Sequence, residues 1–202
     1  MNLVLASASP RRRELLAQCG FTFNVHPAHI PEDPLPHEEP IAYVVRLARQ
    51  KAEVIFREST NANASDKRAP APPQVATSLV VLGADTTVVI DNQILAKPVD
   101  AADAARMLRL LSGRTHRVIT GVAVVTAQRT EVAAEITGVR FLTLSEEEIA
   151  AYIATGEPID KAGAYAIQGY AARWIPRITG DYFNVVGLPL ALVTTMLQAA
   201  TK

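Results

Sequence analysis

The first segment of the chain constrains the fold more than any other. It places a short apolar run, Leu3-Val4-Leu5-Ala6, directly before two serines, a proline and three arginines. The apolar run predicts a buried strand, and the residues that follow predict a helix. Ser9 suits the N-cap, Pro10 the first helical position and Gly20 the end of that helix.

The arginines of this predicted helix indicate a ligand. Arg11, Arg12 and Arg13 occupy the first turn, where the helix already carries about half a positive charge and acidic residues are usual. The arrangement is favourable if an anion binds there. Backbone N–H groups, the hydroxyls of Ser7 and Ser9 and the guanidinium groups then form a phosphate site. The alternative is a solvated arginine cluster without a ligand.

Size and composition limit the class of protein. The chain has 202 residues, 49% of them hydrophobic, and can bury a sizeable core as one large domain or two closely packed lobes. Basic and acidic residues number 20 each, which argues against a nucleic acid polymer or an acidic membrane surface as partner. Cys19 is the only cysteine, so no internal disulfide is expected. No signal peptide or membrane span is predicted, and a cytoplasmic protein is expected.

Two segments follow with different character. Apolar residues at helical spacing predict a helix over residues 41–56, with Lys51 at the edge of the apolar stripe. A lysine there can reach into a cleft or extend to water. Residues 59–78 consist mainly of small, polar and proline residues. They predict a flexible surface loop inserted into the domain.

The remaining pattern indicates the fold class. Strands are predicted at 79–82, 88–90, 116–125 and 131–142, and helices at 100–111, 145–156 and 190–199, with strand-like and loop-like pieces over 160–189. Ser145 and Glu148 form a capping box at the start of one helix. The irregular alternation, with hairpins, predicts an α/β fold with a mixed, largely antiparallel central sheet flanked by helices. No standard nucleotide-binding glycine motif is present.

Asp85 is the strongest candidate for a catalytic residue. It lies between two apolar strand segments, after Gly83 and before Thr86 and Thr87. Burying a carboxylate costs free energy unless a metal ion, a cation or several donors face it. The alternative is a carboxylate that accepts hydrogen bonds from these threonines and holds a bend in the strand. The segment alone leaves both interpretations open.

Further charged candidates lie in two loops. Lys97 follows a strand-like run and precedes Pro98, so it is either a fixed cation at a sheet edge or a residue that protects that edge. Glu32 and Asp33 lie in a proline-rich loop. Acidic loops of this kind can supply oxygen ligands to Mg²⁺, although many are simply solvated.

Gln168 lies in a segment rich in small residues, 160–169, that allows a ligand to approach the backbone. Its amide offers both a donor and an acceptor to the edge of a base, or else satisfies nearby backbone groups. Ser7 and Ser9 lack the Gly-x-Ser-x-Gly setting of a nucleophile and are better interpreted as phosphate ligands. Together the candidates describe a site for a nucleoside triphosphate.

Several collinear motifs resemble the Maf family of nucleotide pyrophosphatases over essentially the whole chain. The matching segments are Leu5-Ala6-Ser7-Ala8-Ser9-Pro10-Arg11-Arg12, Val45-Arg46-Leu47-Ala48-Arg49-Gln50-Lys51-Ala52, Gly83-Ala84-Asp85-Thr86, Lys97-Pro98, Leu111-Ser112-Gly113, residues 160–169 and Asn184-Val185-Val186-Gly187-Leu188-Pro189. The resemblance implies a two-lobed mixed α/β fold, as one domain over residues 1–202, with the site in a cleft. Family members are often dimers, so a homodimer is an open alternative to a monomer.

The resemblance also implies an activity. It is the hydrolysis of a nucleoside triphosphate between the α and β phosphates, with a divalent metal cation, Mg²⁺ or Mn²⁺, as cofactor. Asp85 matches the family's catalytic proton acceptor, and the other matching site positions are Ser7, Arg12, Glu32, Lys51 and Lys97. Arg11, Thr86 and Gln168 match positions that mark the branch acting on dTTP and UTP. In this interpretation Glu32 and Asp85 hold the metal.

Two other functions remain to be separated from this one. The first is a nucleotide-binding regulator of cell division without turnover, which has no need of a buried carboxylate aimed at phosphate. The second is a pyrophosphatase of a modified purine nucleotide, similar to inosine triphosphatases. Base preference distinguishes the second, and Thr86 with Gln168 favours pyrimidines.

Overall fold

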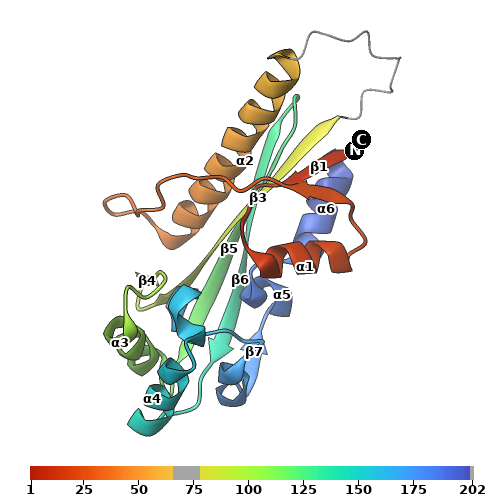
Figure 1. Cartoon of the computed structure of the whole chain (residues 1–202). Coiled ribbons are helices and arrows are strands. Elements are labelled where there is room, and N and C mark those ends of the chain that lie inside the picture. The colour runs from red at the N-terminus through yellow and green to blue at the C-terminus, as the bar shows by residue number, and fades with distance from the viewer. Residues whose placement is uncertain (66–77, 201–202) are drawn as a thin grey trace.

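A seven-stranded mixed sheet forms the centre of the computed structural model, which describes residues 1–65 and 78–200 (Figure 1). The strand order is β2-β1-β3-β5-β6-β7, and β4 pairs with β3. β1 pairs in parallel with β2 and β3, and all other pairs are antiparallel. The strands are β1 (Asn2–Leu5), β2 (Phe23–Val25), β3 (Leu79–Ile90), β4 (Gln93–Leu95), β5 (Thr115–Val125), β6 (Thr130–Arg140) and β7 (Arg177–Thr179). The predicted fold class is confirmed.

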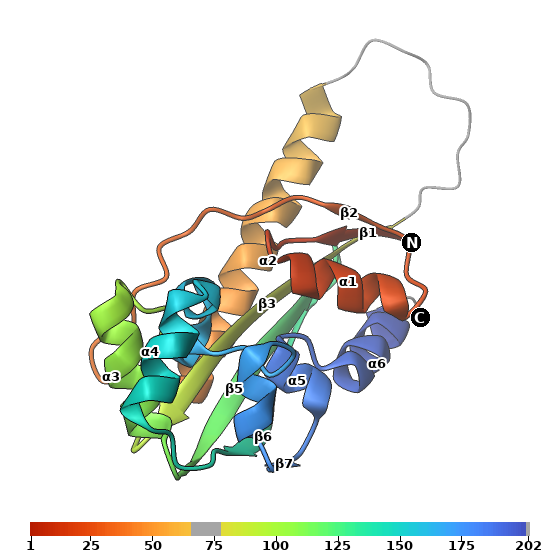
Figure 2. The same cartoon turned by 60° about the horizontal axis from the view of Figure 1, so that its bottom comes forward.

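Helices cover both faces of this sheet. The helices are α1 (Pro10–Gln18), α2 (Pro40–Ser65), α3 (Ala101–Leu111), α4 (Glu146–Ala154), α5 (Tyr182–Val186) and α6 (Leu190–Ala200). The alternation of side chains along β3 explains the two layers. Val80 and Leu82 pack in the large core with α1, α3 and α6, whereas Val81 and Val89 pack against α2. Figure 2 shows α2 on one face and the other helices on the opposite face.

The first helix begins where the sequence predicts. Ser9 is the N-cap of α1, its hydroxyl accepts the Arg12 N–H at 3.4 Å, and Pro10 is the first helical residue. No acidic residue stands in the first turn. The capping box of Ser145 and Glu148 at the start of α4 is also present.

Helix α2 is longer than the sequence pattern predicts. It runs from Pro40 to Ser65, so residues 59–65, expected as the start of the loop, are helical. This part of the prediction is wrong. Neither glycine nor proline occurs between Pro40 and Pro70, and the small polar residues there cost a helix only tenths of a kcal/mol each, about 0.7 at most. Residues 66–77 of the expected loop lie outside the described residues.

Close contact between α2 and the sheet sets the position of Lys51. A Cβ atom at Gly83 would overlap the Ala48 carbonyl oxygen, and one at Gly121 would overlap the Val44 carbonyl oxygen. The two glycines therefore let the backbone of α2 rest directly on β3 and β5. This contact brings the next turn of α2, which carries Lys51, against β3 at Asp85.

The segment over 160–189 forms short helical turns where the sequence indicates strand-like and loop-like pieces. Three 3₁₀ turns, η1 (Glu157–Asp160), η2 (Ala162–Ala164) and η3 (Tyr170–Trp174), precede β7 and α5. Gly163 has a φ of 68° and a Cβ there would overlap Val88, so this turn lies directly on β3. None of the helices in the described part of the chain is long and apolar enough to cross a membrane.

Candidate active site

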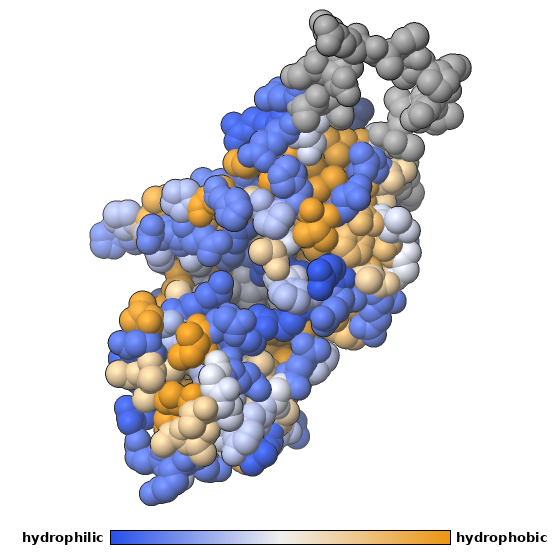
Figure 3. All heavy atoms as spheres, in the orientation of Figure 1, coloured by the Kyte–Doolittle hydropathy of each residue, from blue (hydrophilic) through white to orange (hydrophobic). Residues whose placement is uncertain are grey.

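A cleft of about 620 Å³ gathers the predicted site residues. Mostly hydrophilic side chains surround the hollow on the left of the space-filling view (Figure 3). The loop before α1, the middle of β3, the residues after β4 and the segment over 160–168 all contribute to its walls. Every predicted site residue lines it: Ser7, Arg11, Arg12, Glu32, Lys51, Asp85, Thr86, Lys97 and Gln168.

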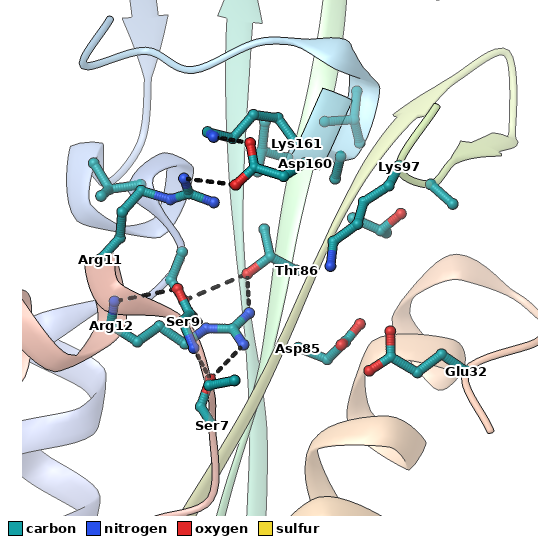
Figure 4. Close-up of a pocket in the computed structure, with 18 of the residues that line it drawn as sticks. Ser7, Ser9, Arg11, Arg12, Glu32, Asp85, Thr86, Lys97, Asp160 and Lys161 are labelled. Atoms are coloured by element: carbon teal, nitrogen blue, oxygen red, sulfur yellow. Dashed lines mark hydrogen bonds and ion pairs between the residues drawn. The ribbon is translucent and has the colours of Figure 1, made fainter. Parts of the chain in front are cut away.

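Arg12 is fixed by hydrogen bonds to three separate parts of the chain. Its Nε donates to the Gly187 carbonyl oxygen at 2.8 Å, its Nη2 to Thr86 Oγ1 at 2.9 Å and its Nη1 to Ser7 Oγ at 3.3 Å (Figure 4). Burial lowers the pKa of Arg12 and Arg11 adds to this, while the charge of Asp85 opposes it. A guanidinium group carries five N–H donors, so two of them remain for a ligand.

The contacts around Arg12 continue into the core. Thr86 Oγ1 lies 2.9 Å from Thr120 Oγ1, and the Thr120 hydroxyl donates to the Asn184 carbonyl oxygen at 3.1 Å. Asn184 is fully buried and donates from Nδ2 to Val118 and Thr137. This chain of contacts anchors the guanidinium from behind. Thr86 thus acts on Arg12 directly, a contact that its place in the sequence does not indicate.

Arg11 points toward the opposite wall of the cleft (Figure 4). Its Nη1 lies 4.0 Å from Asp160 Oδ2, and Asp160 also pairs with Lys161. Both Asp160 and Lys161 line the cleft, although sequence reasoning did not single them out as site residues. Their place in the small-residue segment around Gln168 was the available signal.

Lys51 joins two carboxylates at the base of the cleft. Its Nζ lies 2.6 Å from Glu32 Oε1 and 2.8 Å from Asp85 Oδ1. The side chains of Lys51 and Asp85 are only 9% and 11% exposed, whereas that of Glu32 is 52% exposed. Of the two interpretations of Asp85, the structure favours a carboxylate facing cations, since the Thr86 hydroxyl contacts Arg12 and Thr120 instead.

Burial and charge act in opposite directions on these carboxylates. Burial raises the pKa of Asp85, and the negative charge of Glu32 adds to this, while Lys51 and Arg12 oppose it. Burial also raises the pKa of Glu32, but the hydrogen bond and charge of Lys51, with the charges of Lys97 and Arg12, outweigh it and lower the pKa overall. The surroundings thus raise the pKa of Asp85 above its ordinary value and lower that of Glu32 below its own.

Tyr43 is a further cleft residue that sequence reasoning missed. Its hydroxyl donates to the Glu32 carbonyl oxygen at 2.8 Å and thereby holds the proline-rich loop in place. Burial, with the charges of Asp85 and Glu32, raises the pKa of Tyr43 to about 12. Tyr43 and Lys51 lie two intervals of four residues apart in α2, so they share one helix face. This spacing could have predicted that Tyr43 reaches the same cleft as Lys51.

Lys97 and Gln168 have exposed side chains on the cleft walls. Figure 4 shows the Lys97 ammonium group directed toward the same space as Asp85 and Glu32. Lys97 contributes a positive charge that lowers the pKa of Glu32. Both side chains are thus accessible to a ligand.

The donor set at the base of the cleft fits a hard divalent cation. The carboxylate oxygens of Glu32 and Asp85 face a common position, which the Lys51 ammonium group contacts. Carboxylate oxygens are suitable ligands for Mg²⁺ and Mn²⁺. Residues 1–65 and 78–200 contain no group of three or more His, Cys, Asp or Glu that could hold a metal ion. Mg²⁺ commonly takes one or two protein carboxylates and completes its shell with substrate phosphates and water.

Comparison with known proteins agrees with the geometry. Residues 2–200 match the family profile described as Maf-like protein. A dTTP/UTP pyrophosphatase of Koribacter versatilis (strain Ellin345) is 50% identical over 200 residues, covering 99% of this chain and 95% of that protein. Proteins of the same name from Moorella thermoacetica and Bacillus pumilus are 50% and 46% identical, covering 96% and 97% of this chain and 93% and 95% of those proteins. The chain therefore belongs to the Maf family.

Proposed function

We propose that this protein hydrolyses dTTP and UTP to the nucleoside monophosphate and pyrophosphate. One observation carries the proposal: the buried Lys51–Asp85 pair lies in the same cleft as Arg12, Lys97 and the N-terminus of α1. A carboxylate held among cations suits water activation next to a polyphosphate. The name shared by the relatives, dTTP/UTP pyrophosphatase, supports the same reaction.

The cations bind the triphosphate in this proposal. Arg12 offers its two remaining N–H donors, Lys97 its exposed ammonium group, and Ser7 a hydroxyl in the loop before α1. The N-terminus of α1 adds the partial positive charge of its backbone N–H groups. A cleft of about 620 Å³ is within the range of small-molecule sites, roughly 300–1,000 Å³.

Asp85 accepts the proton of the attacking water. The water oxygen forms a bond to the α phosphorus, the bond from that phosphorus to the bridging oxygen breaks, and pyrophosphate leaves with the electron pair. Burial raises the pKa of Asp85, which makes it a stronger base than an exposed carboxylate. Lys51 fixes its orientation through the 2.8 Å contact.

Glu32 and Asp85 are the residues that would hold Mg²⁺ or Mn²⁺ together with phosphate oxygens. When bound, the metal neutralises the charge that develops on the phosphates. Lys51 must then share the two carboxylates with the metal, and its contacts at 2.6 and 2.8 Å mark the position where a cation is favoured.

Gln168 recognises the base. Its amide donates to O4 and accepts from N3–H of uracil or thymine, a pattern that cytosine reverses. Arg11 lines the same cleft and pairs with Asp160. Uracil and thymine are accepted alike because they share this edge and differ only at the 5-methyl group.

The direct test is pyrophosphate release from a panel of nucleoside triphosphates with Mg²⁺, using Asp85→Asn as the inactive control. Turnover of dTTP and UTP that is lost in the variant supports the proposal. Preferred turnover of a purine nucleotide would keep the chemistry and contradict the role of Gln168. Absence of turnover with every nucleotide would favour a nucleotide-binding regulator.

A further inference from the structure

The loop that carries Gln168, residues 165–170, is held from behind by two side chains that do not line the cleft. The Ala166 N–H donates to the Tyr152 hydroxyl oxygen at 3.2 Å, and the Tyr170 N–H donates to Glu157 Oε2 at 3.2 Å. Gln168 lies between these two points of attachment. The two hydrogen bonds therefore fix the backbone on both sides of the exposed amide.

Tyr152 and Glu157 form one unit. The Tyr152 hydroxyl donates to Glu157 Oε1 at 2.7 Å. Burial and this hydrogen bond raise the pKa of Tyr152 above its ordinary value, so the hydroxyl keeps its proton and its donor role. The ring is fully buried, stacks on Tyr170 at 5.5 Å and meets Trp174 edge-on at 5.2 Å. Neither side chain of the pair can rotate without losing several contacts.

Gly169 shows how closely the Glu157 carboxylate lies against the loop. A Cβ atom at Gly169 would overlap both carboxylate oxygens. A side chain at Gly169 would therefore displace the Glu157 carboxylate from its contact with the Tyr170 N–H. The loop backbone rests on the carboxylate.

We propose that Tyr152 and Glu157 are positioning residues that set the base selectivity of the cleft through Gln168. This inference rests on the proposed function. Discrimination between uracil and cytosine needs the Gln168 amide to lie within hydrogen-bond distance of the base edge, because a mismatched donor or acceptor costs free energy only in close contact. A backbone held on both sides fixes where the Gln168 side chain begins and thereby how closely its amide can approach that edge. The pair therefore controls discrimination between uracil and cytosine, and leaves triphosphate binding to Arg12 and Lys97.

Tyr152→Phe tests this most sharply, because it removes only the hydroxyl and keeps the stacked ring. We expect the kcat for UTP to stay within about twofold of the wild-type value. The KM for UTP is expected to rise about tenfold and the preference for UTP over CTP to fall about tenfold, the usual effect of losing one hydrogen bond. Glu157→Gln keeps the shape but turns an N–H donor toward the Tyr170 N–H or the Tyr152 hydroxyl. It is expected to lower the preference to a similar degree.

Glu148→Gln is the matched control in the same aromatic cluster. Glu148 accepts the Trp174 Nε1–H at 3.1 Å and does not contact the loop backbone, and glutamine also serves in a capping box. This variant is expected to keep the selectivity of the wild type. Inhibition by inorganic triphosphate provides a second control, because it does not involve the base and is expected to be unchanged in Tyr152→Phe.

The outcomes separate this inference from the proposed function. If the wild type prefers UTP over CTP and both Tyr152→Phe and Glu157→Gln keep that preference, the positioning role is wrong and the proposed function stands. If Tyr152→Phe weakens triphosphate inhibition as much as UTP binding, the pair is merely structural and the inference is also overturned. If the wild type shows no pyrimidine preference, the proposed function fails and takes the inference with it.

Discussion

Lys51 Nζ lies 2.8 Å from Asp85 Oδ1, and both side chains are almost completely buried. The two residues are 34 positions apart in the sequence, and the close approach of α2 to β3 brings them together. Each charge compensates for the burial of the other. The same contact joins the stability of the fold to the chemistry of the cleft.

Lys51→Met is expected to lower both activity and stability. It leaves the charge of Asp85 buried without its nearest cation, so the pKa of Asp85 rises further and the carboxylate loses the contact that orients it. Removing one partner of a buried pair costs about 3 kcal/mol, and loss of an effective base lowers kcat/KM about a hundredfold or more. Urea unfolding and pyrophosphate release measure the two effects.

Two further variants make the Lys51 prediction specific. Asp85→Asn added to Lys51→Met is expected to recover part of the lost free energy of unfolding, because the uncompensated charge is gone. Lys97→Met changes an exposed side chain and is expected to leave the free energy of unfolding within about 0.5 kcal/mol. A single Lys51→Met variant as stable as the wild type would contradict the compensation of charges.

Arg12→Lys is expected to raise the KM for UTP about tenfold. Lysine cannot reproduce the simultaneous contacts to Gly187, Thr86 and Ser7, so its ammonium group is not held in the same place. The inhibition constant of inorganic triphosphate is expected to rise in parallel. Arg13→Lys is the matched control, since Arg13 is exposed on the same turn, and an equal effect there would contradict a specific role for Arg12.

Gly83→Ala is expected to displace α2 from β3. The added methyl group would overlap the Ala48 carbonyl oxygen, and forcing an extra group into a packed interior costs about 1–3 kcal/mol. Because Lys51 lies one turn further along α2, activity is expected to fall as well. Gly138→Ala, whose Cβ would meet its neighbours only at 3.8 Å or more, is expected to change neither quantity appreciably.

Acid sensitivity is expected from His116. Burial lowers the pKa of His116 to about 3, against an unfolded value near 6.5. As the pH falls below about 6.5 the unfolded chain takes up a proton that the native protein does not, so stability is lost progressively down to about pH 3. At pH 5 the loss amounts to about 2 kcal/mol.

Urea unfolding between pH 8 and pH 5 measures this loss for His116. His116→Gln keeps a hydrogen-bonding partner for the Tyr165 hydroxyl, which lies 2.8 Å from His116 Nε2, and removes the titrating group. Its stability is expected to be lower at pH 8 but to depend less on pH. A pH dependence equal to that of the wild type would contradict the assignment to His116.

Local sequence signals predicted parts of the fold well. The caps of Ser9 and Ser145 are formed by residues within a few positions of one another, so their chemistry is readable in sequence. Helix α2 extends past the predicted end because no residue stops it, and β2 escaped prediction because it is only Phe23–Val25. The 3₁₀ turns near Gly163 depend on packing against β3, which no local pattern records.

Some of the cleft residues could also be predicted from local sequence, whereas the contacts between others could not. Asp85 and Lys97 stand out in sequence because a charge next to an apolar strand is unusual. The contact of Thr86 with Arg12, and that of Arg11 with Asp160, join residues far apart in the chain. Only the tertiary structure brings such partners together.

Hydrolysis of UTP in ¹⁸O-labelled water tests the central claim, that this cleft directs water onto the α phosphorus. The products are separated and the ¹⁸O content of each is measured by mass spectrometry, with Asp85→Asn as the control for contaminating activity. We expect the label to appear in UMP and pyrophosphate to carry none. Label in pyrophosphate, with unlabelled UMP, would show attack at the β phosphorus and contradict the roles given to Asp85 and Lys51.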